Sequence, residues 1–289
     1  MNFKNTEVFN FEGAFRGMRN PLESWNKSDS FFGFVNSAYP QDAHEDVIEA
    51  WVGKELKEEF SVEWNHTWER YANWLYQNEI LRSDEDITDV ATLGPNDLNL
   101  AQRLILAGPE HMKFMRQIFV SVDITAPIYW WKEFDTYKIG TTANSTSTMH
   151  KLTSKPITMD CFETEELDLD LIANTLGADL FVGDEDEPIE LTAPWRLKDI
   201  WDWIIEECEN LRQKYLETQD KRYWKALIQF LPEAWLQTRT VTLSYANLRN
   251  IYFQRHNHKL NEWHLFCDWV SQLPYAKELI MLEDKNETN

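Results

Sequence analysis

The segment SYANLRNIYFQRHNHKLNEWHLF, residues 244–266, has the highest density of side chains that could do chemistry. Polar groups alternate there with large apolar ones, and the polar set is Asn247, Arg249, Arg255, His258 and Glu262. Such a segment must be largely buried, and a buried arginine needs an anionic partner or several acceptors. A phosphate or an ionised pyrimidine ring would satisfy a guanidinium bidentately, and so would carboxylates of this acidic chain. The pattern therefore predicts either an anion site or structural ion pairs.

Other reactive constellations are weakly supported. His258 and Glu262 would share one helical face, but no third ligand follows at a defined spacing, so a hydrogen-bonded polar face is favoured over a metal site. Cys161, Cys208 and Cys267 form no C-x-x-C motif and are expected to be buried small hydrophobes. The nucleophile elbow G-x-S-x-G and the glycine-rich phosphate loops are absent from the sequence.

Composition narrows the class of protein. A formal net charge of -21 disfavours a nucleic-acid polymer as partner, because that mode of binding needs clustered Lys and Arg. Fourteen tryptophans indicate a heavily packed interior or a subunit interface, so we expect a homo-oligomer. The N-terminal residues do not resemble a targeting segment, and no run approaches roughly 18 apolar residues, so we expect no membrane association and a cytoplasmic location.

Local patterns predict the elements that must position these residues. Glu7–Phe11 alternates like a strand and the following GAFRGMRNP, residues 13–21, reads as a turn. A helix is expected from Asn96 or Asp97 to Gly108, with Leu100, Leu104 and Ala107 on one face. The runs QIFVSVDI (117–124) and IYWWKEF (128–134) favour strands. Residues 138–152, KIGTTANSTSTMHKL, predict a polar loop or a capped, irregular helix start.

Three helical patterns close the chain, at Leu197–Leu216, Arg222–Leu231 and Ser244–Val270. Before them, residues 156–195 hold no Lys or Arg and twelve Asp or Glu, which predicts a solvated acidic insertion. The order of elements predicts an α+β fold with a central sheet flanked by helices, and the length of 289 residues favours a single domain over 1–289.

The C-terminal stretch LPEAWLQTRTVTLSYANLRNIYFQRHNHKLNEWHLFCDW, residues 231–269, resembles the corresponding region of flavin-dependent thymidylate synthases. In that family an LP turn and a Thr-rich stretch lead to N-x-R, and a second Arg and an HAQWE-like segment follow. The five polar residues named above fall on those landmarks, although the chain is several residues shorter between Arg249 and Glu262.

An upstream stretch, YKIGTTANSTSTMH (137–150), occupies the place of the family signature RHRxxSxNExSxRY. Thr142, Asn144 and Ser147 match its Ser, Asn and second Ser. The cationic positions depart from the signature: 137–139 read Tyr-Lys-Ile instead of Arg-His-Arg, and 149–150 read Met-His instead of Arg-Tyr. The GAFRGMRNPLESW segment (13–25) resembles an early family segment as well.

The resemblance implies the thymidylate-synthase-complementing fold, a homotetramer, and reductive methylation or related C5 alkylation of a pyrimidine deoxynucleotide such as dUMP. FAD, NADPH and methylenetetrahydrofolate would be the cofactors, with no metal. Arg255 would be catalytic and would bind the substrate together with Ser147, His258 and Glu262. The cofactor-binding residues would be Thr142, Asn144, Asn247 and Arg249. The alternative is a non-catalytic nucleotide-binding or protein-interaction module on the same scaffold.

Overall fold

The structure is a computed structural model that describes residues 1–36, 87–174, 179–182, 189–192 and 195–283. The chain forms two compact units, each assembled from three stretches of sequence. The first unit contains Met1–Glu7, Ser121–Leu243 and Asn257–Trp269, and the second contains Val8–Val120, Ser244–His256 and Val270–Asn289. The single-domain organisation stays a prediction.

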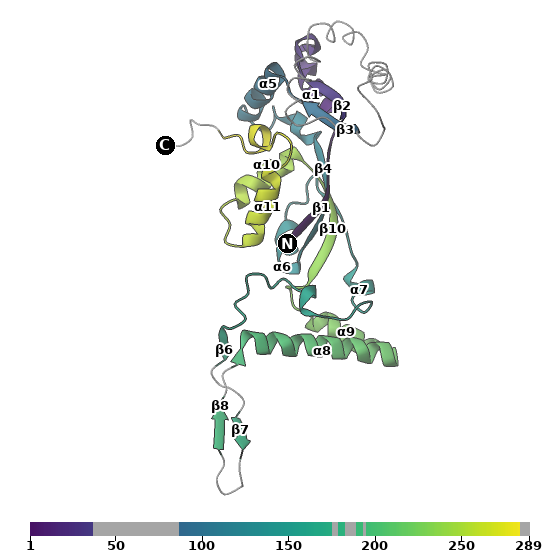
Figure 1. The fold of residues 1–289 in the computed structure, drawn as a ribbon. Coiled ribbons are helices and arrows are strands. Elements are labelled where there is room, and N and C mark those ends of the chain that lie inside the picture. Colours follow the sequence, from purple (N-terminus) through teal and green to yellow (C-terminus); the bar gives the residue numbers. More distant parts are fainter. Residues whose placement is uncertain (37–86, 175–178, 183–188, 193–194, 284–289) are drawn as a thin grey trace. The chain divides into compact units, whose positions relative to one another are not determined.

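A four-stranded sheet has the order β1 (Asn2–Phe9), β4 (Phe119–Pro127), β10 (Leu236–Ser244) and β5 (Thr142–Ser145) (Figure 1). Together with the helices described below, this sheet makes the fold α+β, as predicted. Alternate residues of β4 are fully buried, which confirms the strand expected over 117–124.

Strands β4 and β10 run antiparallel. Thr125 and Thr238 share a side-chain hydrogen bond of 2.7 Å, and Thr240 donates to Asp123 at 2.5 Å. The residue numbers of the paired positions therefore increase along β10 as they decrease along β4. Strand β5 pairs antiparallel with the far side of β10 and places Asn144 opposite Thr240. The polar stretch predicted as a loop therefore contributes an edge strand.

The run IYWWKEF forms helix α6 (Ile128–Phe134), so the strand predicted there is wrong. Pro127 is the N-cap residue in extended conformation, and Trp130, Trp131 and Phe134 are buried. That spacing belongs to one face of a helix and not to the alternation of a strand. The β-preference of the aromatic residues misled the prediction, because packing against tertiary neighbours overrides such preferences.

In the second unit, the predicted turn after β1 is wrong, because residues Phe11–Arg19 form helix α1. Phe11, Ala14, Phe15 and Met18 are buried at spacings of three and four residues, so the segment is amphipathic despite its two glycines. The strand β1 ends at Phe9, before the predicted end at Phe11. The Asn-Pro pair follows in the short helix η1 (Asn20–Leu22).

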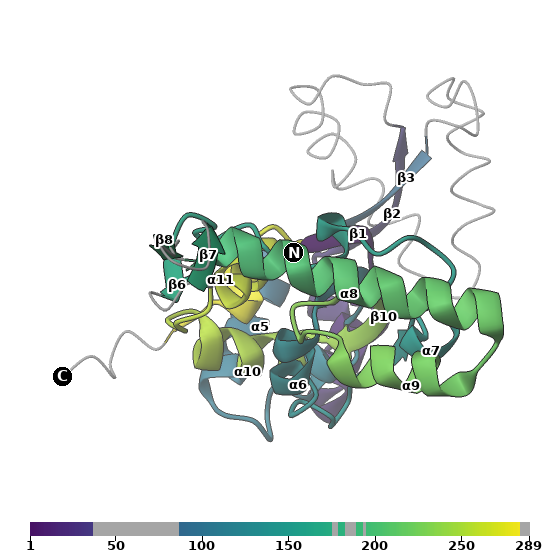
Figure 2. The same ribbon diagram turned by 90° about the horizontal axis from the view of Figure 1, so that it is seen from below.

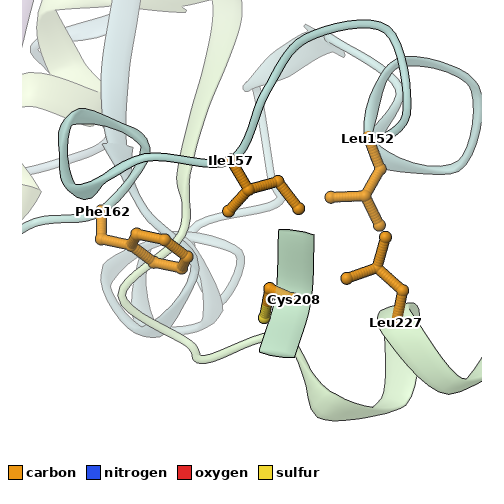
Figure 3. Close-up of a cluster of buried hydrophobic side chains, with 5 residues drawn as sticks. All are labelled: Leu152, Ile157, Phe162, Cys208 and Leu227. Atoms are coloured by element: carbon orange, nitrogen blue, oxygen red, sulfur yellow. The ribbon is translucent and has the colours of Figure 1, made fainter. Parts of the chain in front are cut away.

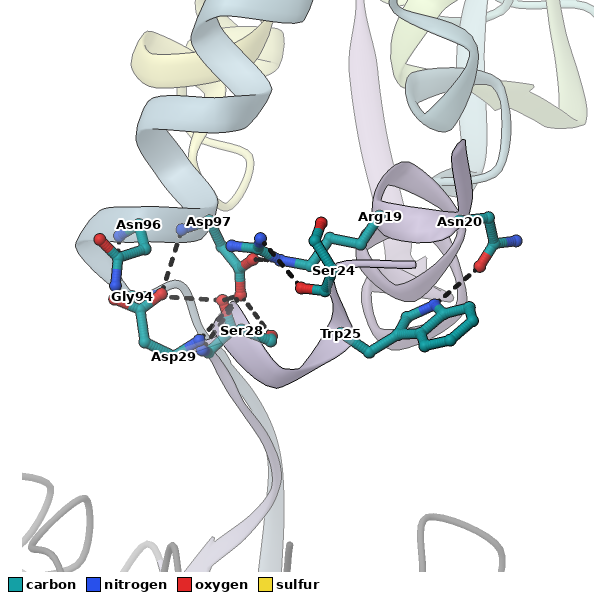
Figure 4. Close-up of polar contacts among 10 residues, drawn as sticks. Arg19, Asn20, Ser24, Trp25, Ser28, Asp29, Gly94, Asn96 and Asp97 are labelled. Atoms are coloured by element: carbon teal, nitrogen blue, oxygen red, sulfur yellow. Dashed lines mark hydrogen bonds and ion pairs between the residues drawn. The ribbon is translucent and has the colours of Figure 1, made fainter. Parts of the chain in front are cut away.

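Helix α5 (Pro95–Leu106) confirms the helix expected before Gly108, which has a φ of 116° that suits glycine at a helix end. Its N-cap residue is Gly94, and the Asp29 carboxylate accepts from the backbone N–H groups of Asn96 at 2.9 Å and Asp97 at 3.0 Å (Figure 4). The buried face is a correction, since it carries Asp97, Ala101 and Ile105 where Leu100, Leu104 and Ala107 were expected.

Helices α8 (Leu197–Thr218) and α9 (Lys221–Phe230) confirm two predicted helices and lie side by side in the first unit (Figures 1 and 2). They close over an apolar cluster whose fully buried members are Leu152, Ile157, Phe162, Cys208 and Leu227 (Figure 3). The period of three to four residues in α8 thus reflects core packing.

The helix predicted over Ser244–Val270 is two helices, α10 (Tyr245–Arg255) and α11 (Asn261–Ser271). Between them the Leu260 backbone N–H donates to the His258 ring at 3.2 Å, and the Trp263 N–H donates to the Leu260 carbonyl. These contacts lie in the connection from α10 to α11, which interrupts the helix even though the hydrophobic period continues.

The remaining elements are short. In the acidic insertion, β6 (Ile172–Asn174) pairs with β9 (Trp195–Arg196), and β7 (Asp179–Val182) pairs with β8 (Ile189–Thr192); its GDEDEP sequence, 183–188, lies outside the described residues. Strands β2 (Phe31–Asn36) and β3 (Ile87–Thr92) form another pair. The other helices are η2 (Trp25–Lys27), η4 (Lys113–Arg116), α7 (Thr148–Lys151), η5 (Met159–Cys161) and η6 (Ala276–Ile280). No helix in the described ranges is long and apolar enough to cross a membrane.

Candidate functional site

Two predicted site residues, His258 and Glu262, meet helix α6 in the first unit. The Tyr129 hydroxyl donates to Glu262 Oε1, and Glu133 Oε2 lies 3.5 Å from His258 Nε2. Glu133 Oε2 also accepts from Trp263 Nε1 at 2.9 Å. Tyr129 and Glu133 are four residues apart and share one face of α6, so that face holds the start of α11.

Glu262 is 8% exposed, which makes it one of the most deeply buried carboxylates of the described chain. Burial, the hydrogen bond to Glu262 and the nearby carboxylates all raise the pKa of the Tyr129 phenol. The phenol therefore stays protonated at neutral pH and acts as the donor that fixes Glu262 Oε1. A cavity of about 320 Å³ opens beside Glu262, between Tyr129, Trp201 and the 163–167 loop.

The predicted residues of the upstream motif lie along β5 and the start of α7, also in the first unit. Thr142 and Asn144 are exposed on the edge strand, opposite Thr242 and Thr240 of β10. Ser147 is the N-cap residue of α7 and accepts from the His150 backbone N–H at 3.3 Å. The capped helix start predicted for this stretch is confirmed, and it gives the Ser147 hydroxyl a structural partner.

In the second unit, Asn247 belongs to a capping box at the start of α10. Its Oδ1 accepts from the Ser244 hydroxyl at 2.6 Å and from the Ser244 backbone N–H at 3.3 Å, while Ser244 Oγ accepts from the Asn247 N–H. This reciprocal arrangement satisfies orphan donors at the helix N-terminus. The amide oxygen of Asn247 is thus engaged by the fold itself.

Arg249 lies two residues further along α10 and is partly buried. Its guanidinium donates to the Ile280 carbonyl at 2.8 Å and stacks on Phe253, with its central carbon 4.6 Å from the ring centre. Burial lowers the pKa of this guanidinium, an effect that the negative charge of Glu283 partly opposes. Among the described residues, no carboxylate approaches it within ion-pairing distance.

Arg255 is the last residue of α10 and is half-buried. A cation in the last turn of a helix is favoured by the partial negative charge of the helix C-terminus. The predicted site residues therefore fall into three groups: Thr142, Asn144 and Ser147 along β5 and α7; His258 and Glu262 against α6; and Asn247, Arg249 and Arg255 along α10.

Thiol and metal chemistry find little support in the parts of the chain that the structure describes. Burial raises the pKa of Cys208 to about 11 and that of Cys267 to about 12, so both stay protonated near neutral pH. All three cysteines are free, and Cys161 is half-buried. No cluster of three or more metal-ligating side chains occurs among the described residues.

The sequence reasoning missed Tyr129 and Glu133, the two α6 residues that hold Glu262, His258 and Trp263. A strand over 128–134 would also have placed Tyr129 and Glu133 on one face, but further apart along the chain direction and beside other residues. The available signal was the Pro127 that precedes them, because a proline commonly marks the start of a helix.

Comparison with known proteins gives matches at the level of structure alone. No family model matches the chain. No curated protein matches it either. Among solved structures it is similar to the flavin-dependent thymidylate synthase ThyX from Helicobacter pylori complexed with FAD and dUMP, with 15% identity, 86% of this chain and 97% of that chain covered, and a TM-score of 0.43.

A second similar structure is the UMP/dUMP methylase PolB from Streptomyces cacaoi bound with 5-Br UMP. The identity is 12%, the coverage is 63% of this chain and 82% of that chain, and the TM-score is 0.42. The family that the motifs of this chain resemble is thus found among its structural neighbours. TM-scores this low assign no residue a role.

Proposed function

We propose that this chain binds a flavin and a pyrimidine deoxynucleotide of the dUMP type and alkylates C5 of the pyrimidine. The observation that carries the proposal is Arg249, a partly buried guanidinium with a carbonyl as its hydrogen-bonding partner and no ion-paired carboxylate among the described residues. The order of the polar residues along β5, β10, α10 and α11 supports it through the resemblance to flavin-dependent thymidylate synthases.

Arg249 fits an anionic ligand better than a purely structural role. A guanidinium has several N–H donors, and one carbonyl leaves most of them without an acceptor among the described residues. Burial disfavours its charge, so an anion that reaches it would gain more from the contact than it would at an exposed arginine. A phosphate takes two parallel hydrogen bonds from a guanidinium, and FAD carries such groups. Arg249 is therefore proposed to hold the FAD pyrophosphate.

The other residues are proposed to divide as the resemblance implies. Arg255 would bind the pyrimidine and stabilise negative charge that develops on its carbonyl oxygens, which is electrostatic catalysis by a fixed cation. Ser147, His258 and Glu262 would contact the nucleotide, and the exposed Thr142 and Asn144 would contact the cofactor. The flavin, when bound, supplies the hydride, while methylenetetrahydrofolate would supply the carbon and NADPH the electrons.

The state of the cysteines supports chemistry without an enzyme thiolate. A thiol that attacks a pyrimidine ring must ionise, and the raised pKa values of Cys208 and Cys267 oppose ionisation. Flavin-based reduction needs no such nucleophile. The homotetrameric state and the cytoplasmic location belong to the same proposal and stay predictions.

A second candidate is a non-catalytic nucleotide-binding or protein-interaction module on the same scaffold. The observation that favours it is that two predicted ligand-binding side chains, Ser147 and Asn247, both have their oxygens engaged in helix caps. The Asn247 oxygen already accepts two hydrogen bonds and would have to give up a cap that contributes about 1 kcal/mol before it could accept from a ligand, whereas the Ser147 hydroxyl can still donate its own hydrogen. The lost Arg and His positions of the upstream signature point the same way.

Calorimetry and a turnover assay separate the two candidates. We expect FAD and dUMP to bind the purified chain, and the Arg255→Gln variant to bind dUMP at least tenfold more weakly, because a charge-assisted hydrogen bond contributes about 1.5–3 kcal/mol. Arg103→Gln, on the exposed face of α5, is the matched control and should bind as the native chain does. Conversion of dUMP with methylenetetrahydrofolate and NADPH supports the enzyme, and binding without conversion supports the nucleotide-binding module. Absence of both overturns these two and leaves the protein-interaction module.

A further inference from the structure

The cavity beside Glu262 has an acidic lining that the proposed nucleotide chemistry does not explain. It has a volume of about 320 Å³, at the lower end of the range for small-molecule sites, and it lies within the first unit. Four glutamates line it, at positions 163, 165, 166 and 262, together with the aromatic rings of Tyr129 and Trp201. A phosphate would be repelled by such a lining, whereas a cation would be attracted.

Glu262 is the most buried carboxylate of the lining, and one of its two oxygens has no hydrogen bond among the described residues. Glu262 is 8% exposed, and its Oε1 accepts from the Tyr129 hydroxyl. Its Oε2 has no hydrogen bond among the described residues. Two described side-chain atoms are both fully enclosed and without a partner, Trp130 Nε1 and Thr141 Oγ1, and Glu262 Oε2 is not one of them, so it is accessible. Oε2 therefore opens to the cavity, and a buried anionic oxygen in that position needs a donor.

The charges around the cavity do not cancel. Glu163 is occupied, because its Oε2 accepts from the Met1 nitrogen at 3.0 Å. Glu165 and Glu166 are exposed and have no ion pair among the described residues, and Lys259 is the cation of the lining besides the Met1 nitrogen that Glu163 engages. Glu165, Glu166 and Glu262 thus outnumber Lys259 by two charges. Burial first, and then the negative charges of Glu262, Glu163 and Glu166, raise the pKa of Tyr129, so these three carboxylates all lie near its hydroxyl.

The spacing of the carboxylates selects the kind of cation. Within the described ranges, no three acidic or histidine side chains are close enough together to hold one metal ion. Carboxylates that line one cavity without clustering suit separate ammonium groups on a flexible chain. The indole of Trp201 and the phenol ring of Tyr129 supply faces on which an ammonium or its methylene neighbours can rest.

We propose that this cavity binds a linear aliphatic amine with at least two ammonium groups. One ammonium donates to Glu262 Oε2 at the floor, and another lies between Glu165 and Glu166 at the rim. The methylene chain between them packs against Trp201. The inference uses a different ligand and none of the α10 arginines, and it assigns Glu262 to an ammonium group where the resemblance would have it contact the nucleotide.

Titration calorimetry with 1,5-diaminopentane tests the site, and 1,5-pentanediol and Mg²⁺ serve as the neutral and metal comparisons. The titrations are made at about 0.15 M salt, where exposed charges more than a Debye length apart are largely screened. We expect one saturable site for the diamine and none for the diol or Mg²⁺. Glu262→Gln should weaken the diamine about tenfold or more. Glu166→Gln, on the exposed rim, should weaken it about two- to fivefold.

Glu206→Gln is the matched control, because Glu206 is an exposed glutamate of α8 that does not line the cavity. It should bind the diamine as the native chain does. Circular dichroism of each variant shows whether it folds, and the rim variant keeps the test decisive if Glu262→Gln does not. Absence of saturable diamine binding, equal binding of Mg²⁺, or equal weakening by Glu206→Gln overturns the proposal. Failure of FAD or dUMP to bind leaves it standing.

Discussion

Two arginines of the second unit, Arg19 at the end of α1 and Arg249 in α10, are both withdrawn from solvent but have opposite surroundings. Arg19 is 5% exposed and donates from Nε to Asp97 Oδ1 at 2.5 Å. Arg249 meets a carbonyl and an aromatic ring, with no ion-paired carboxylate in the described part of the chain. The first guanidinium is neutralised by the fold, whereas the second keeps its charge available.

Asp97, the partner of Arg19, accepts hydrogen bonds at both of its carboxylate oxygens (Figure 4). Asp97 is fully buried, and its Oδ2 accepts from the hydroxyls of Ser28 and Ser30, both at 2.6 Å. Burial, the largest influence, raises the pKa of Asp97, but the hydrogen bonds from Ser28, Ser30 and Arg19 outweigh it and hold the pKa below its ordinary value. A saturated ion pair of this kind serves the fold, and an unsaturated guanidinium is a candidate for ligand binding.

The largest expected effect comes from breaking the saturated pair. Asp97→Asn leaves the Arg19 charge buried without compensation, which costs about 3–5 kcal/mol of unfolding free energy. Urea denaturation followed by circular dichroism measures the loss. Asp160→Asn, at an exposed position of η5, is the matched control and should change stability by less than about 0.5 kcal/mol. A similar small loss for Asp97→Asn would mean that Arg19 does not depend on its carboxylate.

The pair of Arg212 with Glu209 in α8 extends the comparison to the first unit. The hydrogen bond from Arg212 is the main influence that lowers the pKa of Glu209 to about 2. Because this folded-state pKa lies below the ordinary value of 4.5, the stabilisation is complete above about pH 4.5 and is lost as the pH falls toward about 2. Its size is about 2–3 kcal/mol.

Glu209→Gln removes this source of acid sensitivity. We expect the variant to be less stable than the native chain at neutral pH and to lose less stability between about pH 4.5 and 2. Urea unfolding at a series of pH values measures both changes. Parallel pH profiles for the two proteins would show that Glu209 titrates at the same pKa in the folded and unfolded states.

A smaller effect is expected at Ser147, the residue that caps α7. Ser147→Ala should cost about 0.5–1 kcal/mol through the lost acceptor for the His150 N–H. Thermal unfolding measures this loss, and Ser145→Ala, at an exposed position of β5, is a control of the same residue type. If Ser147→Ala leaves stability unchanged but weakens dUMP, then the hydroxyl serves the ligand and not the cap.

The smallest stability effect is expected at Arg249. Arg249→Gln loses the hydrogen bond to the Ile280 carbonyl but also removes a desolvated charge, so these changes should offset each other to within about 1 kcal/mol. Urea unfolding of the ligand-free variant provides the measurement. A loss as large as that of Asp97→Asn would place Arg249 with Arg19 as a structural arginine.

Periodicity in the sequence predicted the elements whose burial is regular. Helices α8 and α9 followed from spacings of three to four residues, because that period records which face meets the core, and strand β4 followed from its β-branched and aromatic residues. Helix α6 was missed since its aromatic residues also favour strands, and the break before α11 was missed since residues 256–260 contain no Gly or Pro to mark it.

The sequence predicted which polar residues belong to the candidate site and their order along the chain, but not which side chains they contact in the fold. The sequence identified Arg249 as a polar residue of a buried segment, and whether a carboxylate would neutralise it depends on tertiary contacts. Arg19 and Asp97 are 78 positions apart, and no local pattern links them. The cap at Asn247, by contrast, follows Ser244 by three residues and is the kind of contact that local spacing can predict.

The central claim, that Arg249 is left available for a phosphate, is tested most directly by calorimetric titration with FAD and with riboflavin, which lacks the phosphates. The native chain and the Arg103→Gln control should bind FAD more tightly than riboflavin. Arg249→Gln should weaken FAD by about tenfold or more and leave riboflavin nearly unchanged, so that the preference shrinks. An undiminished preference for FAD in the folded Arg249→Gln variant would contradict the claim.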